Sequence, residues 1–226
     1  RKPACRRKKF HALHSRVATD LLNEKPSMKK YIALTIILAL VAAVIFIRYE
    51  IAAPAKAAAH DLEAINGIIV GKTTEAELLG RSAFQTIDRH CHEGSCFYHM
   101  DAQNMFLNRL HLAPRTLMSI VVSVNNGMVT GVYVLTMKWG LPPISLQQVE
   151  TLPSECNSNP CAKRMVPPNK VLASIRILFN RDSELRNKMP ELVNPECFSR
   201  LRGCNTYAEL LPGTRSLNLD VLAAAK

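Results

Sequence analysis

The feature that most constrains this chain is an uncharged, apolar segment near its N-terminus. Residues 31–47 contain no charged side chain, and they lie between the pair Lys29 and Lys30 and the single Arg48. This segment is at the short end of what crosses a bilayer, since a spanning helix usually needs roughly 20 residues. Basic side chains at its ends can reach toward the membrane surface and lengthen it. The sequence therefore predicts one transmembrane helix over residues 31–48.

Basic residues are concentrated ahead of this segment. Residues 1–30 contain ten lysines and arginines against two acidic residues, whereas the part from residue 51 onward carries only +3 of the chain's net charge of +11. Positively charged flanks stay in the cytoplasm, so residues 1–30 are predicted as a cytoplasmic tail. We expect a protein of the inner (cytoplasmic) membrane with its C-terminal domain in the periplasm. The basic cluster at residues 6–9 has no interleaved aromatic pattern, so no nucleic-acid partner is expected.

Two alternatives concern the N-terminal part. Residues 1–27 are either a cytoplasmic tail or an upstream extension, because Met28 followed by two lysines is typical of the start of an export signal. Small-residue cleavage patterns follow at residues 53–57. However, the apolar segment exceeds the roughly 7–15 residues of a cleaved signal's core, and charged residues separate it from those alanines. We favour an uncleaved signal anchor.

Six of the seven cysteines lie beyond the predicted membrane helix, where thiols oxidise. They form three close pairs: Cys91 with Cys96, Cys156 with Cys161, and Cys197 with Cys204. Six cysteines allow 15 pairings, and three local disulfide bonds are the simplest of them. Cys5 falls on the cytoplasmic side and is expected to stay reduced.

The residues after the membrane segment predict a linker over residues 49–59 and a disulfide-stapled α+β domain over residues 60–226. Helices are predicted for residues 60–69, 75–84 and 195–211, and strands for residues 96–100, 106–111, 117–124, 128–137 and 171–180. Thr74 and Glu77 have the spacing of a capping box, and Asn126-Gly127 is typical of a type I′ hairpin turn. The proline-rich residues 141–170 are predicted to be irregular. This order of elements favours an antiparallel sheet flanked by helices.

Several segments resemble an uncharacterised set of bacterial membrane-anchored exported proteins. The resemblance lies in residues 71–75 (GKTTE), 108–114 (NRLHLAP), 197–204 (CFSRLRGC) and 209–212 (ELLP). It implies the same topology and no particular activity. Residues 71–73 are also similar to the G-x-T pattern of small outer-membrane assembly lipoproteins, whose fold pairs two helices with an antiparallel sheet. The chain lacks that family's lipid-attachment cysteine, and Gly80 comes sooner than its second glycine.

One cluster carries side chains that could bind a metal. Residues 89–99 contain imidazoles, thiols and a carboxylate: His90, Cys91, His92, Glu93, Cys96 and His99. Imidazole and thiolate suit zinc or copper. However, the cysteine spacing is not that of a zinc knuckle, and a disulfide bond would remove the thiolates. A disulfide loop with solvated histidines is the favoured interpretation, with a metal site at His90, His92 and His99 as the alternative.

Motifs of common enzyme classes are not found in the sequence. It contains no G-x-S-x-G, P-loop, G-x-G-x-x-G, H-E-x-x-H or C-x-x-C motif, and Ser119 and Ser123 have no acid or base nearby in sequence. We therefore expect a non-enzymatic binding domain without a cofactor, whose partner is an envelope protein or peptide. The alternative is a metal-binding protein or metal-dependent enzyme that uses the His90 to His99 loop.

Overall fold

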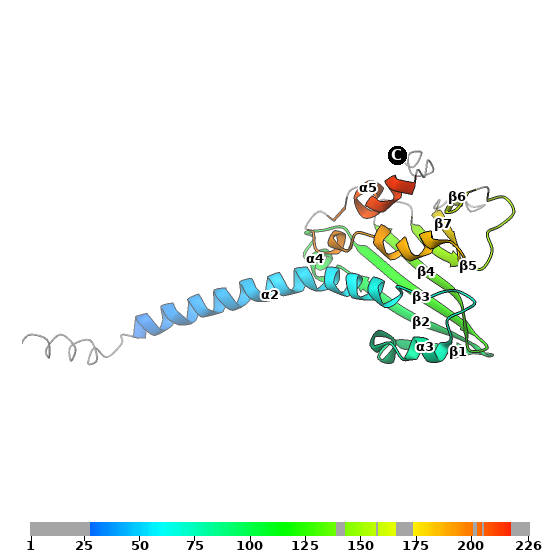
Figure 1. Ribbon diagram of the computed structural model, residues 1–226. Coiled ribbons are helices and arrows are strands. Elements are labelled where there is room, and N and C mark those ends of the chain that lie inside the picture. Colours follow the sequence, from blue (N-terminus) through cyan, green and yellow to red (C-terminus); the bar gives the residue numbers. More distant parts are fainter. Residues whose placement is uncertain are drawn as a thin grey trace, which may run out of the picture. The chain divides into compact units, whose positions relative to one another are not determined.

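The computed structural model describes residues 28–138, 143–156, 158–165, 174–200, 203–204 and 206–217 (Figure 1). The chain divides into two compact units, Arg1–Ile47 and Arg48–Lys226. The predicted cytoplasmic tail, up to residue 27 and including Cys5, lies outside the described residues. The described part of the first unit is therefore the beginning of one long helix, α2 (Met28–Ala64).

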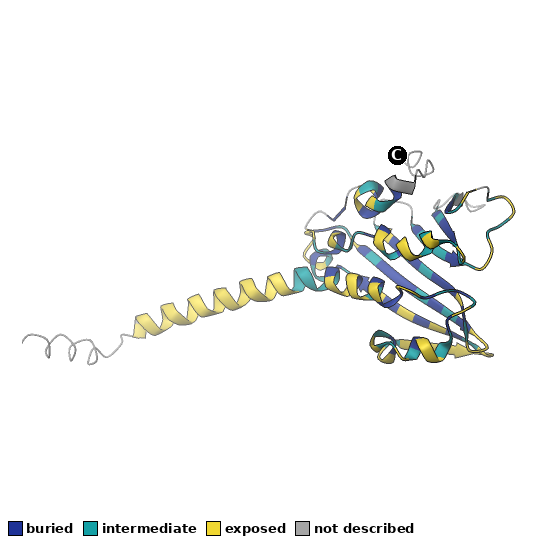
Figure 2. Cartoon of the chain, in the orientation of Figure 1, coloured by how far each residue is buried: buried dark blue, intermediate teal, exposed yellow. Residues whose placement is uncertain are grey.

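Helix α2 contains the apolar segment. By length and composition it can cross a membrane, and its most apolar stretch has no side chain buried within the protein (Figure 2). A signal sequence near an N-terminus has the same properties. The prediction of an apolar membrane-length helix is confirmed at this level.

The predicted linker over residues 49–59 is helical. Alanine, the strongest helix former, supplies six of its eleven residues, and α2 continues through Pro54 although proline removes one backbone hydrogen bond. Ala55, Ala58 and Leu62 recur at helical spacing and are buried in the second unit. The folded domain thus begins inside α2 and not after a separate linker.

A seven-stranded sheet forms the second unit. Its strands are β1 (Asp88–His92), β2 (Ser95–Gln103), β3 (Thr116–Asn125), β4 (Met128–Lys138), β5 (Ile144–Val149), β6 (Cys161–Met165) and β7 (Ser174–Asn180). Their order is β1-β2-β3-β4-β5-β7-β6, and only the β5–β7 pair is parallel. An α+β domain with a mostly antiparallel sheet is confirmed.

Two hairpins of the same kind form one end of the sheet. The predicted turn between β3 and β4 is present, with φ of 49° at Asn126 and 74° at Gly127. The unpredicted strand β1 joins β2 through Glu93 and Gly94, whose φ values of 47° and 80° have the same left-handed pattern. The N–H of Asn126 donates to the carbonyl of Gly94 at 3.3 Å, so the two turns are in contact.

The predicted capping box starts the short helix α3 (Glu75–Leu79). The Thr74 hydroxyl accepts from the Glu77 N–H at 3.2 Å, and the Glu77 carboxylate accepts from the Thr74 N–H at 2.8 Å. The helix is shorter than predicted, because Gly80 caps it and the 3₁₀ helix η1 (Ser82–Gln85) follows. The backbone before α3 pairs with the start of β4, where the Gly71 N–H donates to the Val129 carbonyl at 2.7 Å.

The strand predicted over residues 106–111 is wrong. This segment begins with helix α4 (Met105–Arg109), because the chain must reverse between β2 and β3. The Asn104 amide holds the reversal closed: its oxygen accepts from the Thr116 N–H at 2.8 Å, and its nitrogen donates to the Pro114 carbonyl at 2.9 Å.

The prediction of irregular structure over residues 141–170 is also partly wrong, since β5 and β6 lie there. Described prolines of this region, at positions 143, 153 and 160, lie outside both strands, as proline in a sheet requires. Strand β7 confirms the last predicted strand from Ser174 onward, while residues 171–173 lie outside the described residues.

Short helices follow β7. They are η2 (Glu184–Lys188), η3 (Pro190–Leu192), η4 (Pro195–Phe198), α5 (Tyr207–Leu210) and η5 (Pro212–Leu217). The short helices predicted within residues 195–211 are thus present, and the Cys197–Cys204 disulfide joins them. The other two local pairs are joined as well, with Cα–Cα distances of 4.1 Å for Cys91–Cys96 and 5.6 Å for Cys156–Cys161.

The hydrophobic core lies on one face of the sheet. Alternate side chains of β2 and β5 are buried, from Cys96 to Ala102 and from Ile144 to Gln148. The apolar side chains among them belong to one core cluster with residues of α2, α3, η1 and the C-terminal helices. In Figure 1, α2 and η2 cross the same side of the sheet. The helices thus cover this face.

Candidate functional site: the open face of the sheet

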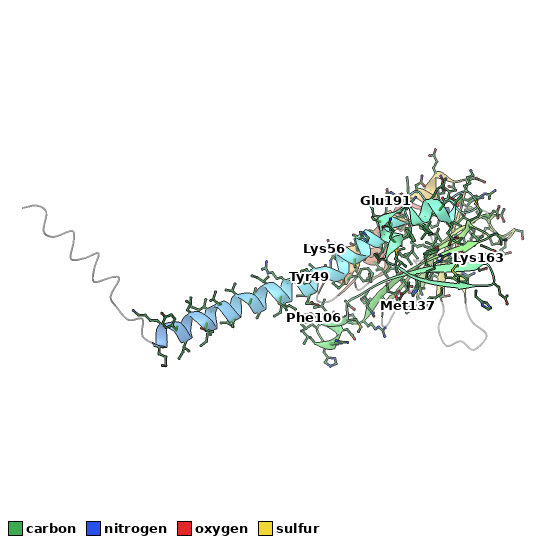
Figure 3. All side chains as sticks on the ribbon, turned by 90° about the horizontal axis from the view of Figure 1, so that it is seen from below. Tyr49, Lys56, Phe106, Met137, Lys163 and Glu191 are labelled. Atoms are coloured by element: carbon green, nitrogen blue, oxygen red, sulfur yellow. A yellow bond between two sulfur atoms is a disulfide. The ribbon has the colours of Figure 1, made fainter. Side chains whose placement is uncertain are left out.

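The other face of the sheet is the candidate site. No helix of the described part of the chain forms a core with it, and its central side chains are partly exposed. Figure 3 places Met137 on the side of the sheet away from α2. We call this surface the open face, and its residues are Phe97, His99, Asp101, Leu117, Ser119, Val121, Tyr133, Leu135, Met137, Ser145 and Gln147.

Strand register arranges these residues in rows across the sheet. One row runs from His99 through Val121 and Tyr133 to Gln147. The next runs from Asp101 through Ser119 and Leu135 to Ser145. Directly opposite side chains on antiparallel strands lie about 4.5–5.5 Å apart at Cβ, so each row is a continuous surface.

The open face is more apolar than a solvent-facing sheet surface needs to be. Phe97 is 45% exposed and Met137 is 39% exposed, while Leu117, Val121 and Leu135 are half-buried. An antiparallel sheet with one wet face normally alternates apolar and polar side chains. Here apolar side chains occupy both sides of β3 and β4.

A histidine and a serine meet near the centre of this face. The Nε2 atom of His99 lies 2.7 Å from the Ser119 hydroxyl and 3.6 Å from the Asp101 carboxylate. In a nucleophilic triad the carboxylate orients the ring through its other nitrogen, Nδ1. Here both partners approach the same nitrogen, so the three residues lack the triad arrangement.

The surroundings of Ser119 also differ from those of a nucleophile. Its side chain is buried, and it lies within β3 between β2 and β4. Strand β3 is paired with β2 on one side and β4 on the other, so the backbone amides beside Ser119 belong to the sheet ladders and do not form an oxyanion site there. The contact between His99 and Ser119 joins two strands and orients the imidazole on the open face.

The predicted metal-binding histidines lie on the same side of the sheet but do not converge. His90 and His92 lie on β1, opposite Phe97 and Ser95 of β2. His99 lies on β2 itself, opposite Asp88 of β1. Within the described residues, no three histidine, cysteine, aspartate or glutamate side chains come close enough to hold a metal ion. The cysteines of this hairpin are joined to each other.

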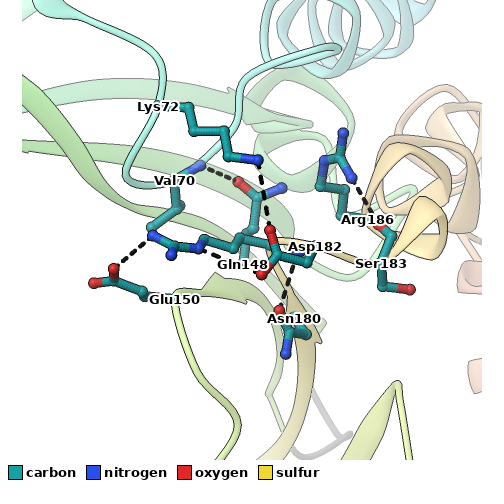
Figure 4. Close-up of polar contacts among 9 residues, drawn as sticks. Val70, Lys72, Gln148, Glu150, Asn180, Asp182, Ser183 and Arg186 are labelled. Atoms are coloured by element: carbon teal, nitrogen blue, oxygen red, sulfur yellow. Dashed lines mark hydrogen bonds and ion pairs between the residues drawn. The ribbon is translucent and has the colours of Figure 1, made fainter.

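A polar cluster lies at the carboxyl ends of the parallel strands β5 and β7 (Figure 4). Gln148 is buried, and its oxygen accepts from the Val70 N–H at 2.8 Å. Arg181 pairs with Glu150 at 2.5 Å, and Lys72 lies 3.6 Å from Asp182. These contacts attach the loop before α3 to the strand ends.

A shallow depression adjoins this cluster. It is lined by Asn66, Gln148, Arg186 and Met189 among others, and its enclosed volume is about 10 Å³, room for no more than a single water molecule. Small-molecule sites usually occupy roughly 300–1,000 Å³. Lys72 and Arg181 are paired with acidic side chains, and Arg186 donates to the Ser183 carbonyl at 2.9 Å. The Nε atoms of Arg181 and Arg186 are buried without a hydrogen-bond partner among the described residues. The hydrogen bonds and ion pairs of the cluster join neighbouring segments of the chain and indicate a structural role.

A second charged group fastens α3 to the sheet. The Tyr98 hydroxyl and the Arg89 guanidinium both donate to Oε1 of Glu75, each at 2.6 Å. Burial, and then the Glu75 carboxylate, raise the pKa of Tyr98 to about 12. The Arg89 guanidinium also lies 5.7 Å from the centre of the Tyr98 ring. These groups point to the covered face and take no part in the open face.

Comparison with known proteins gives no match: no protein-family model, no curated protein and no solved structure is similar to this chain at a significant level. The resemblances described from the sequence therefore stay predictions.

The sequence pattern identified only part of the open face. Ser119 and Ser123 belong to the predicted strand over residues 117–124, and His99 belongs to the predicted disulfide loop with a possible metal site. Leu117 and Val121 lie on the same side of this strand as the two serines, and they indicate that this side is not simply polar. Phe97, Tyr133 and Leu135 join them only through the strand register.

Proposed function

We propose that this protein is a single-pass, membrane-anchored protein of the bacterial envelope that binds another envelope protein or peptide. In this proposal the N-terminus is cytoplasmic, the apolar part of α2 crosses the inner membrane, and the α+β domain lies in the periplasm. The concentration of basic residues ahead of the apolar segment supports that orientation. The three local disulfides support an oxidising compartment.

The observation that carries the binding function is the partly exposed apolar surface of the open face. Six of its eleven residues are apolar or aromatic, and they span β2, β3 and β4: Phe97, Leu117, Val121, Tyr133, Leu135 and Met137. Burial of such surface is worth about 25 cal/mol per Å² removed from water. Contiguous exposed apolar surface on a folded domain is typical of a protein-interaction site.

Polar groups on the same face would give the contact specificity. Gln147, Ser145 and Asp101 lie at the ends of the two rows and supply hydrogen-bond donors and acceptors. A protein interface usually combines apolar side chains with polar groups at its rim. The geometry at Ser119 favours this binding role over acyl-transfer chemistry.

Site-specific photocrosslinking tests the proposal. A photoreactive phenylalanine analogue replaces Leu135 at the centre of the open face, and a matched variant carries it at Glu63, an exposed position on α2. The full chain is irradiated in bacterial cells and the membranes are analysed by mass spectrometry. We expect a discrete adduct from position 135 that is absent from position 63 and is lost with the added substitution Val121→Glu.

Two results would contradict a binding function at this face. One is the same set of adducts from both positions, and the other is the absence of adducts from a correctly folded and disulfide-bonded variant. Measured turnover of a substrate that depends on His99 and Ser119 would replace binding with catalysis.

A further inference from the structure

Exposed apolar side chains gather in one short segment of the domain. In the described part of the chain beyond residue 49, five large hydrophobic side chains are exposed, and three of them lie within eight residues. Met105 is 41% exposed, and Leu110 and Leu112 are each 51% exposed. We call residues 105–112 the α4 loop. Single exposed leucines are ordinary, but a cluster of this kind marks a contact surface.

The backbone of the α4 loop is held in place, so these side chains are displayed from a fixed support. Leu107 is fully buried between them. Its carbonyl accepts from the N–H groups of Leu112 at 2.9 Å and Ala113 at 3.3 Å, and the Asn108 amide donates to the Ala113 carbonyl at 3.3 Å. A preformed surface of this kind loses little conformational entropy when it binds.

The sequence on either side of the α4 loop carries basic residues and no acidic ones. No acidic residue occurs between Asp101 and Glu150, whereas this stretch contains two arginines and a lysine. Arg109 lies in α4 and Arg115 just before β3, and both are exposed. Lys138 ends β4 beside the start of β3, where the Glu209 carboxylate lies close enough to interact with it, so the basic character rests on the two arginines. Exposed apolar side chains combined with basic ones fit the surface of a bilayer that contains anionic lipids.

Chain connectivity brings the start of the domain close to the proposed membrane boundary. The apolar segment ends at Arg48, and Ala55 is already buried in the domain. Seven residues of helix rise only about 10 Å. Along the axis of α2, Figure 3 places Phe106 near the level of Tyr49 and Lys56, and Figure 1 shows α4 beside the same part of α2.

We propose that the α4 loop is a membrane-contact element, with Leu110 and Leu112 inserted at the level of the lipid headgroups and Arg109 paired with anionic lipid phosphates. This inference rests on the proposed membrane anchor. Together with α2, the loop would give the domain a second attachment to the bilayer. That attachment would fix which way the open face points.

Fluorescence quenching tests the contact in the full chain. Trp139 is the only tryptophan, so Trp139→Phe gives a background without tryptophan. Into this background either Leu112→Trp or the control Phe97→Trp is introduced. Phe97 is also exposed but lies in the β1–β2 hairpin, toward the opposite end of β2. Each variant is reconstituted into vesicles of phosphatidylcholine and anionic phosphatidylglycerol, with the phosphatidylcholine brominated on its acyl chains or left unbrominated.

We expect the brominated lipid to reduce the emission of Leu112→Trp and to leave that of Phe97→Trp unchanged. Equal emission of Leu112→Trp in the two kinds of vesicle overturns the contact, provided that the chain floats with the vesicles and resists alkaline extraction. A chain that fails to remain with the vesicles overturns both the anchor and the contact. Leu110→Trp repeats the test, and disulfide mapping confirms that each variant is folded.

Discussion

The hydroxyl group of Tyr98 offers a direct test of how the domain is held together. Its replacement in Tyr98→Phe keeps the ring, the edge-on contact with Phe84 at 5.9 Å between ring centres, and the Arg89 guanidinium above it. Only the hydrogen bond to Glu75 is lost. A hydrogen bond to a charged group contributes about 1.5–3 kcal/mol. We expect a loss near the lower limit, about 1.5 kcal/mol, because Arg89 still pairs with Glu75.

The stability lost in Tyr98→Phe depends on pH, because the Tyr98 hydroxyl itself titrates. Burial and the Glu75 carboxylate raise the pKa of Tyr98 to about 12 in the folded protein, above the value of 10.0 for an ordinary tyrosine. The stabilisation is therefore fully present below pH 10 and decreases as the pH rises toward 12. At pH 11 the unfolded chain is mostly ionised at this residue and the folded chain is not, which removes about 1.4 kcal/mol from the wild type alone.

Urea unfolding of the full chain in detergent, followed by near-ultraviolet circular dichroism, measures both effects. The difference in unfolding free energy between wild type and Tyr98→Phe is expected to be about 1.5 kcal/mol at pH 7 and close to zero at pH 11. Tyr133→Phe is the matched control: no hydrogen bond of its hydroxyl is found among the described residues, and a change within about 0.5 kcal/mol is expected. A difference that is absent at pH 7, or the same at both pH values, would refute the reasoning.

Two further substitutions test the contacts around the sheet. Gly71→Ala places a Cβ atom 2.5 Å from Nη1 of Arg181 at a φ of +74°, whereas the control Gly127→Ala has the same φ and no atom within 4 Å of the new Cβ. Both variants lose about 1–2 kcal/mol of stability because alanine disfavours the left-handed backbone. We expect urea unfolding to show a larger loss for Gly71→Ala. Asn104→Ala leaves the buried N–H of Thr116 without its side-chain acceptor, so a loss of about 1–3 kcal/mol is expected, and an unchanged unfolding midpoint would contradict the role given to this amide.

The elements that were predicted correctly are determined by neighbouring residues. The turn at Asn126-Gly127 needs two left-handed residues, and the capping box of Thr74 and Glu77 needs only its own spacing. Both signals are contained within a few residues. They were therefore readable without knowledge of the rest of the fold.

The elements that were missed depend on distant partners. Strand β5 is short and follows prolines. It pairs in parallel with β7, which comes about 30 residues later in the chain. Strand β1 is polar and exposed along its whole length, so it has no apolar alternation to detect. The reversal at α4 depends on Asn104 and its bond to Thr116.

The candidate site was missed for the same reason. In the sequence, His99 belongs to a possible metal-binding loop, and Ser119 has no acid or base nearby. The register between β2 and β3 brings the two side chains together and places Asp101 opposite Ser119. An apolar residue such as Val121 could be read as core on either face until the helices were known to cover only the other one.

The most direct test of the account is non-reducing peptide mapping, with metal analysis, of the full chain purified from bacterial membranes. We expect a chain that resists alkaline extraction and holds three disulfides, Cys91–Cys96, Cys156–Cys161 and Cys197–Cys204, with Cys5 reduced and no stoichiometric metal. Recovery of the chain from the soluble cytoplasm with reduced cysteines would contradict it. So would stoichiometric zinc or copper together with free thiols at Cys91 and Cys96, which would make the histidine hairpin the site.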